Sequence, residues 1–301
     1  MSEKIQEQPS KSNRRFINSI LCPTNLSPSS DEALRYGVAF ARAYNAKLYL
    51  CYVAENPEAL EPEQVNNFFL ESIAPYISVT DVPWIHWDGI IAKGEAEEVI
   101  PKLAAEHNID LIIMRSRRRP YGAMLLGSTA EAVCHTATCP VLVTHPQEQE
   151  WVDLAGEIKL KQILVAYDFS EHSDLALSYG LSLAQEFQTE LHLMNVAPNS
   201  LDTLSEDKEL DKNKAIEHLR GRIPAEAHLW AKITPVITTG KPYHQILAYA
   251  QENNIDLICI GAHGIEDNSW ALFGSNADRV LRQAKCPVLI IHKANQTEEK
   301  L

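Results

Sequence analysis

The chain carries an internal duplication, which restricts its fold more than any other feature of the sequence. The pair Ile20-Leu21 recurs as Ile163-Leu164, and the pair Tyr36-Gly37 recurs as Tyr179-Gly180, both at the same offset. Two copies of one sequence pattern indicate two copies of one structural unit. The 301 residues are long enough for two units of about 150 residues, which is an ordinary domain size.

The correspondence between the two copies continues to their ends. Gly127-Ser128 corresponds to Gly274-Ser275, and Cys139-Pro140-Val141-Leu142 corresponds to Cys286-Pro287-Val288-Leu289. The stretch between the copies is polar and acidic, which is typical of a linker. The sequence therefore predicts a disordered segment over 1–15, a first domain over 16–146, a linker over 147–158, a second domain over 159–293 and a C-terminal tail over 294–301.

The composition favours a globular protein and argues against several classes of function. Apolar residues make up 45% of the chain and charged residues 22%, so a packed core can form. The 27 Lys and Arg residues against 40 Asp and Glu residues give a net charge of −13, which repels nucleic acid. No stretch approaches the roughly 18 consecutive apolar residues that cross a bilayer, and the polar N-terminus does not resemble a signal peptide. We expect a cytoplasmic protein with no membrane insertion and no nucleic-acid partner.

The six cysteines lie in apolar segments without CxxC spacing, which indicates reduced thiols packed as small hydrophobic side chains. Cys134, His135 and Cys139 together allow a metal site to be considered. They lack a second pair of ligands and lie where a helix meets a strand, so no metal site is expected there.

Short apolar segments alternate with helical patterns in the second copy. This alternation predicts an α/β fold in which a parallel sheet is covered by helices on both faces. Ligands of such sheets bind beyond the carboxyl ends of the strands, where the winding direction reverses, so the loops after the first and fourth strands are candidate sites. Strands are predicted over 162–166, 191–196, 231–237, 257–260 and 288–291, and helices from Ser170-Glu171 onward and over 207–219, 243–251 and 276–283.

A glycine turn follows the fourth predicted strand. Gly261-Ala262-His263-Gly264 is separated by nine residues from Gly274-Ser275, which begins a helix. Glycine lets backbone N–H groups approach a phosphate closely, and a helix N-terminus supplies further donors, to which the Ser275 hydroxyl would add at the cap. Glycines at a strand end are also ordinary turn residues. The pattern is neither a Walker loop nor the dinucleotide fingerprint GxGxxG.

A carboxylate follows the first predicted strand. Asp168 lies at the same sheet edge as the glycine turn, within Ala166-Tyr167-Asp168-Phe169-Ser170. An acidic group there either accepts hydrogen bonds from a ribose or an adenine, or caps the next helix. The residues alone leave both readings open.

Three motifs of the second copy together resemble the universal stress protein family. They are the opening Ile163-Leu164-Val165-Ala166-Tyr167-Asp168-Phe169-Ser170, the Gly-x2-Gly-x9-Gly-Ser pattern from Gly261 to Ser275, and the ending Cys286-Pro287-Val288-Leu289. The match covers nearly all of both copies. The chain therefore resembles the tandem form of the family, in which two such domains are fused.

This resemblance implies two doubly wound five-stranded parallel sheets of the adenine nucleotide alpha hydrolase-like fold. It also implies that the copy with intact glycines binds ATP, or ADP or AMP, with Mg²⁺ held through the phosphates. No residue is carried over as catalytic or as a metal ligand. The nucleotide-binding residues carried over from the motifs are Ala166, Tyr167, Asp168, Val196, Ile260, Gly261, His263, Gly264, Gly274, Ser275 and Asn276.

The first copy departs from the motif. Asn25 stands at the position of Asp168, and Arg115 and Arg118 stand at the positions of Gly261 and Gly264. Because side chains then occupy the space of the phosphates, no ATP is expected there in the family's pose. The arginine cluster at 115 and 117–119 is interpreted as solvated charge that covers an abandoned pocket, with anion binding as the alternative. In the second copy, Glu266 and Asp267 lie within the loop, where they either face solvent or recruit the cation.

The leading functional hypothesis is an ATP-binding regulatory or signalling protein of the stress response, in which nucleotide orders the loop between Gly264 and Gly274 and a protein partner reads the change. A slow ATP hydrolase or autophosphorylating enzyme, with His263 or Glu266 as base and Ser275 as acceptor, is the second hypothesis. The third is a structural pair of domains without a ligand. In every case the final strands, 141–144 and 288–291, are expected to meet within the chain, and a further homodimer is considered.

Overall fold

The computed structural model describes residues 17–54, 62–76, 85–116, 126–144, 151–153, 155–197, 207–264 and 273–292. The predicted N-terminal segment and C-terminal tail lie outside these residues. In the described part of the chain, no helix combines the length and the apolar character needed to cross a bilayer.

The N-terminal half, residues 17–144, alternates strands and helices throughout. Its helices lie between successive strands, as the crossover connections of a parallel sheet require. The elements are β1 (Ser19–Thr24), α1 (Pro28–Tyr44), β2 (Lys47–Ala54), α2 (Pro62–Ile73), η2 (Ala74–Tyr76), β3 (Trp87–Lys93), α3 (Ala96–Glu106), β4 (Leu111–Arg115), α4 (Ser128–Thr136) and β5 (Val141–Thr144).

The C-terminal half, residues 155–292, repeats this order. Its elements are β6 (Gln162–Ala166), α5 (Glu171–Phe187), β7 (Glu190–Ala197), α6 (Asp207–Arg220), η4 (Ala225–Leu229), β8 (Ile233–Thr239), α7 (Pro242–Glu252), β9 (Leu257–Gly261), α8 (Ser275–Gln283) and β10 (Val288–Ile291). The predicted elements are all present. The third strand begins two residues later than predicted, because the backbone N–H groups of Trp230 and Ala231 donate to the Ala227 carbonyl and keep this segment in the turn.

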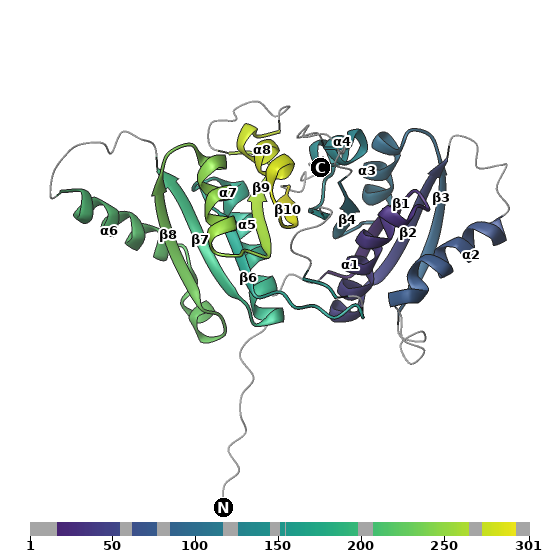
Figure 1. The fold of residues 1–301 in the computed structure, drawn as a ribbon, viewed down its shortest axis with the longest axis horizontal. Helices are drawn as coiled ribbons and strands as arrows, with labels where there is room; N and C mark the ends of the chain where they lie inside the picture. Colours follow the sequence, from purple (N-terminus) through teal and green to yellow (C-terminus); the bar gives the residue numbers. More distant parts are fainter. Residues whose placement is uncertain are drawn as a thin grey trace, which may run out of the picture.

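All ten strands form one sheet, in the order β3-β2-β1-β4-β5-β10-β9-β6-β7-β8. Each half contributes five parallel strands, and the halves join through an antiparallel pair in which Val143 lies opposite Val288. The expected meeting of the two final strands is therefore confirmed. Figure 1 shows β10 near the centre of the molecule, with α2 and α6 at the two outer ends.

The central strands β4, β5, β9 and β10 are buried from both faces, which explains their nearly continuous apolar sequence. Along β9 the side chains of Leu257 and Cys259 enter one core, while those of Ile258 and Ile260 enter the other. Successive side chains of a strand point to opposite faces, so a sheet with helices on both sides needs apolar residues at every position. Both cores contain residues from the two halves of the chain.

A carboxylate fixes the start of the first strand in each half. Asp110 Oδ2 accepts hydrogen bonds from the backbone N–H groups of Asn18 and Ser19, at 2.8 and 3.0 Å. Asp256 Oδ2 accepts from Lys161 and Gln162, both at 2.9 Å. The repeated Ile-Asp-Leu-Ile motif therefore has a structural role at the edge of the sheet opposite the predicted ligand site.

The segment between the halves is more than the solvated linker predicted from its polar composition. Trp151 is only 2% exposed, and its ring packs edge-on against Tyr36, with centroids 4.8 Å apart, and against Phe40. Phe187 of α5 contacts Phe40 from the other half. The two apolar side chains Trp151 and Val152 outweigh their polar neighbours, because burying an aromatic ring releases far more free energy than exposing a polar side chain costs.

Candidate functional site

The strand order places a reversal of winding between β6 and β9. These strands are neighbours, but the chain continues from β6 to β7 on one side and from β9 to β10 on the other. Helices that follow the two strands lie on opposite faces of the sheet and leave a crevice at the carboxyl ends. A cavity of about 610 Å³ opens at this point.

Every residue predicted to bind the nucleotide lines this cavity. Residues far apart in the chain are brought together because parallel strands all end at one edge of the sheet. The predicted residues found there are Ala166, Tyr167, Asp168, Val196, Ile260, Gly261, His263, Gly264, Gly274, Ser275 and Asn276. Their role in binding remains a prediction.

Nine further residues line the cavity and were not predicted. They are Phe169, Ser173, Met194, Asn195, Ala197, Gly240, Pro242, Ile246 and Ala277. Several of them follow or end β7 and β8, and the rule that ligands bind at strand carboxyl ends could have found these from the predicted strands. Pro242 and Ile246 belong to α7, and only the packing of that helix over the sheet brings them to the cavity.

Asp168 serves the local backbone with one of its oxygens. Its Oδ1 accepts hydrogen bonds from the Ser170 backbone N–H at 3.0 Å and from the Ser170 hydroxyl at 2.5 Å. Ser170 itself caps α5, since its hydroxyl accepts from the Ser173 N–H. In the first copy, Asn25 takes the same place and accepts from the Ser27 hydroxyl at 2.6 Å. The turn therefore needs an acceptor at this position but does not need a charge.

The second oxygen of Asp168 faces the glycine turn. A Cβ placed on Gly264 would lie 2.8 Å from Asp168 Oδ2, which is closer than real Cβ contacts allow. Any side chain at residue 264 would therefore push against the carboxylate. The two candidate loops, one after β6 and one after β9, therefore approach each other closely at residue 264.

Gly261 has a different reason to be glycine. A Cβ placed there would lie 2.7 Å from His172 Cβ and 3.0 Å from the His172 carbonyl carbon, in the first turn of α5. From the sequence, this glycine is expected to let a phosphate approach the backbone. Close packing between the end of β9 and α5 is sufficient to require it, although the residue also borders the cavity.

A backbone hydrogen bond connects the glycine turn with the start of α8. The Gly274 N–H donates to the Ala262 carbonyl at 2.8 Å, and Gly274 is the N-cap of α8. Ser275 is thus the first helical residue. The sequence predicted that Ser275 lies at the cap, but Gly274 holds that position. The N–H groups of Ser275, Asn276 and Ala277 belong to the first turn of α8, where a helix has no acceptors of its own to offer. Glu266, Asp267 and Trp270 lie outside the described residues.

The opposite end of the cavity is apolar and its backbone is held firmly. Val196, Met194 and Ile246 line it, and the Asn195 side chain donates to the Tyr167 carbonyl at 2.8 Å. The Tyr167 hydroxyl donates a short hydrogen bond to Asp174. Burial, followed by this bond to Asp174, raises the pKa of Tyr167, so the phenol keeps its proton.

Histidines gather at the end of the sheet beside the glycine turn. The rings of His172 and His263 lie 5.1 Å apart in an edge-to-face arrangement. His292 follows β10 and is 9% exposed. Burial, together with the nearby histidines His263, His172 and His135, lowers the pKa of His292 to about 4, so this ring is neutral at pH 7.

The matching place in the N-terminal half is occupied differently. Arg115, which replaces Gly261, makes an ion pair with Glu32 of α1 at 2.5 Å, and its side chain is only 13% exposed. This contact favours the interpretation that the arginine fills an abandoned pocket. Arg117, Arg118 and Arg119 lie outside the described residues.

Among the described residues, Cys134, His135 and Cys139 do not form a group of ligand atoms close enough to hold a metal ion. Burial raises the pKa of the Cys134 and Cys139 thiols, which keeps both protonated. Within the described ranges, the group of side chains whose geometry could suit a metal is instead Glu131, His135 and Asp278. Arg282 already contacts both carboxylates, at 2.7 and 2.9 Å, and forms ion pairs that connect α4 and α8.

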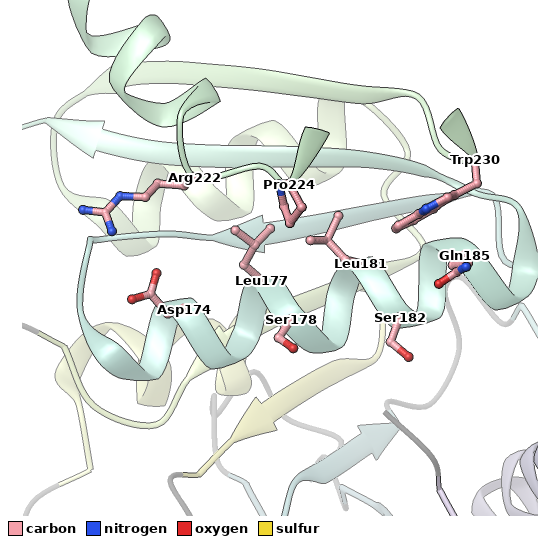
Figure 2. A pocket seen from close by; sticks show the side chains of 9 residues that line it. All are labelled: Asp174, Leu177, Ser178, Leu181, Ser182, Gln185, Arg222, Pro224 and Trp230. Atoms are coloured by element: carbon pink, nitrogen blue, oxygen red, sulfur yellow. The ribbon is translucent and has the colours of Figure 1, made fainter. Parts of the chain in front are cut away.

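A second cavity, of about 190 Å³, lies along the outer side of α5 (Figure 2). Leu177 and Leu181 point toward Pro224 and Trp230 across it, and Asp174 and Arg222 lie at one end. Its walls come from α5 and from the segment after α6. No predicted site residue lines it.

Comparison with known proteins is consistent with this arrangement. The model of the Universal stress protein family matches residues 17–145 and 159–292. Universal stress protein MJ0531 of Methanocaldococcus jannaschii is 31% identical over 149 residues, which make up 46% of this chain and 85% of that protein. Universal stress protein YxiE of Bacillus subtilis is 28% identical over 144 residues, or 43% of this chain and 97% of that protein.

A solved structure extends the likeness over both halves. The structure of a universal stress protein from Archaeoglobus fulgidus covers 92% of this chain and 98% of its own, with a TM-score of 0.66 at 23% identity. At this identity the likeness concerns the fold. The two relatives above each match about half of the chain, whereas this structure matches the paired arrangement.

Proposed function

Since the chain belongs to the universal stress protein family in its tandem form, we propose that its C-terminal half binds an adenine nucleotide and acts through it as a regulatory module of the stress response. The observation that carries the proposal is the cavity at the winding reversal, which is lined by all eleven residues that the resemblance assigns to nucleotide binding. A cavity of about 610 Å³ falls within the range of small-molecule sites.

The two ends of the cavity suit the two ends of a nucleotide. Val196, Met194 and Ile246 offer an apolar surface to a base, and the carboxylate of Asp168 offers an acceptor to a ribose hydroxyl. Backbone N–H groups in the first turn of α8 offer donors to the phosphates. The described lining contains one carboxylate, Asp168, so Mg²⁺ would be held through the phosphates.

The N-terminal half is proposed to bind no nucleotide in this pose. Arg115 and its ion pair with Glu32 occupy the region where the C-terminal half has only Gly261. The predicted consequence is one nucleotide per chain. A protein partner would then read the state of the C-terminal half alone.

Calorimetric titration of the purified chain with ATP, ADP and AMP tests the proposal. The expected result is binding at one site per chain, with Gly264→Ala weakening the affinity by about tenfold or more, because the new methyl group displaces the Asp168 carboxylate. The unliganded thermal midpoint of the variant serves as the folding control. Two nucleotides per chain, or undiminished binding by the variant, would contradict the proposal.

Phosphate release measured in the same samples separates a switch from an enzyme. A binding module leaves ATP intact over hours. Turnover that Gly264→Ala abolishes would replace the regulatory proposal with hydrolysis at the same site.

A further inference from the structure

The wall of the cavity contains an aromatic residue, Phe169, whose ring packs against side chains that lie outside the cavity. Phe169 lines the cavity, and His218 stacks on its ring with centroids 4.6 Å apart and planes 11° apart. The guanidinium carbon of Arg222 lies 5.4 Å from the centroid of the same ring. His218 is in the last turn of α6 and Arg222 follows that helix, and neither residue lines the cavity.

The backbone conformation of Phe169 belongs to the fold, but its contacts belong to this half. Phe169 has a φ of +67°, in the left-handed region that bulky residues rarely adopt. Leu26, at the same place in the N-terminal half, has a φ of +57°, so the conformation does not depend on a nucleotide site. An aliphatic Leu26 offers no ring face for stacking. The aromatic stack is therefore particular to the half that carries the intact motif.

The end of α6 has few other attachments. Of its described side chains, Leu219 is fully buried, while the others are exposed or half-buried, and Ile223 in the following turn is 7% exposed. Figure 1 shows α6 at the outer end of the molecule, beside β8. Two apolar anchors and the stack on Phe169 thus set the position of this helix end.

We propose that Phe169 is an affinity-determining residue of the nucleotide site, positioned by His218 and Arg222, and that nucleotide binding therefore orders the end of α6. The inference rests on the proposed nucleotide binding by the C-terminal half. A bound nucleotide that contacts Phe169 restricts the motion of this residue, and Phe169 in turn restricts its stacking partners. By reciprocity, loss of the stack lowers the affinity for nucleotide.

The same contacts reach the outer surface. Arg222 and Asp174 lie at one end of the outer cavity in Figure 2. Asp174 accepts a hydrogen bond from the hydroxyl of Tyr167, whose ring meets Phe169 edge-on at 5.1 Å. A change in the order of the end of α6 thereby alters the surface formed by α5 and the segment after α6. This gives a partner a nucleotide-dependent surface away from the cavity mouth.

Substitution of His218 tests the positioning role without touching the cavity. ATP binding by His218→Leu is expected to be about 3- to 10-fold weaker than that of the wild type, which matches the strength of one aromatic pair. His218→Phe keeps a stacking ring and is expected to stay within about twofold of the wild type. His228→Leu, at an exposed histidine of η4, is the matched control and should leave ATP affinity unchanged.

Hydrogen exchange supplies the readout that a merely structural histidine would not change. ATP is expected to slow amide exchange over 216–223 in the wild type and in His218→Phe, but not in His218→Leu or Arg222→Gln. If the wild type binds ATP and His218→Leu binds it equally well, with the same protection of α6, the positioning role is overturned while the proposed function stands. If the wild type binds no ATP, ADP or AMP, both fall.

Discussion

At the scale of single residues, equivalent positions of the two halves can be compared directly. Asp168 and Asn25 make the same hydrogen bond to a serine two residues later, at 2.5 and 2.6 Å. The amide of Asn25 thus takes the place of the Asp168 carboxylate, and the turn is retained. We therefore expect the turn to fold without the charge of Asp168, whose proposed contribution is to ligand binding.

Asp168→Asn is therefore expected to bind ATP about tenfold more weakly with an unchanged thermal midpoint, because a charged hydrogen-bond acceptor is lost while the turn is retained. Calorimetry and thermal unfolding measure the two effects. The matched control is Asn25→Asp, which should leave one nucleotide per chain. A midpoint lowered by several degrees would show instead that the carboxylate has a structural role.

His292 gives the protein a pH-dependent stability. Burial and the neighbouring histidines lower its pKa from 6.5 to about 4, so the unfolded state binds a proton at a higher pH than the folded state does. The free energy of unfolding accordingly falls as the pH drops from about 6.5 to about 4. At pH 5 this loss is on the order of 2 kcal/mol.

His292→Gln removes this titration while keeping a polar side chain. Urea unfolding at pH 7.5 and pH 5 is expected to show a smaller loss of stability in the variant than in the wild type. His228→Gln, at an exposed histidine, should behave as the wild type does. Equal losses in all three proteins would mean that the pKa of His292 is the same in the folded and unfolded states.

At the scale of elements, the segment between the halves acts as part of the core. Trp151 packs on Tyr36 and Phe40 of α1, and its backbone N–H donates to the Tyr36 hydroxyl at 3.3 Å. The short bridge between Val152 and Ile158 turns the chain back toward β6. The segment thereby fixes how the C-terminal half follows the N-terminal half.

Trp151→Ala is expected to lower the free energy of unfolding by about 3–5 kcal/mol, which is the usual cost of removing a large buried aromatic side chain. Trp151→Phe, which fills most of the space, should cost clearly less. Urea denaturation monitored by circular dichroism measures both. A loss below about 1 kcal/mol in Trp151→Ala would show that the side chain is dispensable for packing.

At the scale of the whole molecule, the halves share one sheet and both cores. β5 and β10 pair in the middle of the sheet, and Phe187 of α5 contacts Phe40 and Tyr44 of α1. An interface of this kind resembles the interior of a domain more than a contact between independent domains. The two halves should therefore unfold together.

One cooperative unfolding transition is expected, with coincident midpoints for hydrogen exchange in β2 of the first half and in β7 of the second half. ATP should raise both midpoints equally, because a ligand that binds only the folded state stabilises the whole cooperative unit. Two separated transitions, with only the later half responding to ATP, would show that the shared sheet does not couple the halves.

The sequence by itself determined the duplication, the α/β class and the placement of the glycine turn and Asp168 at one sheet edge, because these follow from periodicity and from the rule that parallel strands end together. It also determined that the halves differ, since arginines stand where the second copy has glycines. It did not determine why Gly261 is a glycine. The reason is close packing against His172 of α5, a residue that lies about ninety positions earlier in the chain.

Only the tertiary structure decided that the segment between the halves packs into the core and what surrounds the ring of Phe169. The burial of Trp151 within a polar segment depends on which aromatic side chains of α1 and α5 come together, and no local pattern encodes that meeting. The stack of Phe169 on His218 joins a strand end to a helix end about fifty residues away. Local sequence reports periodicity and turns, whereas contacts between distant side chains exist only once the chain has folded.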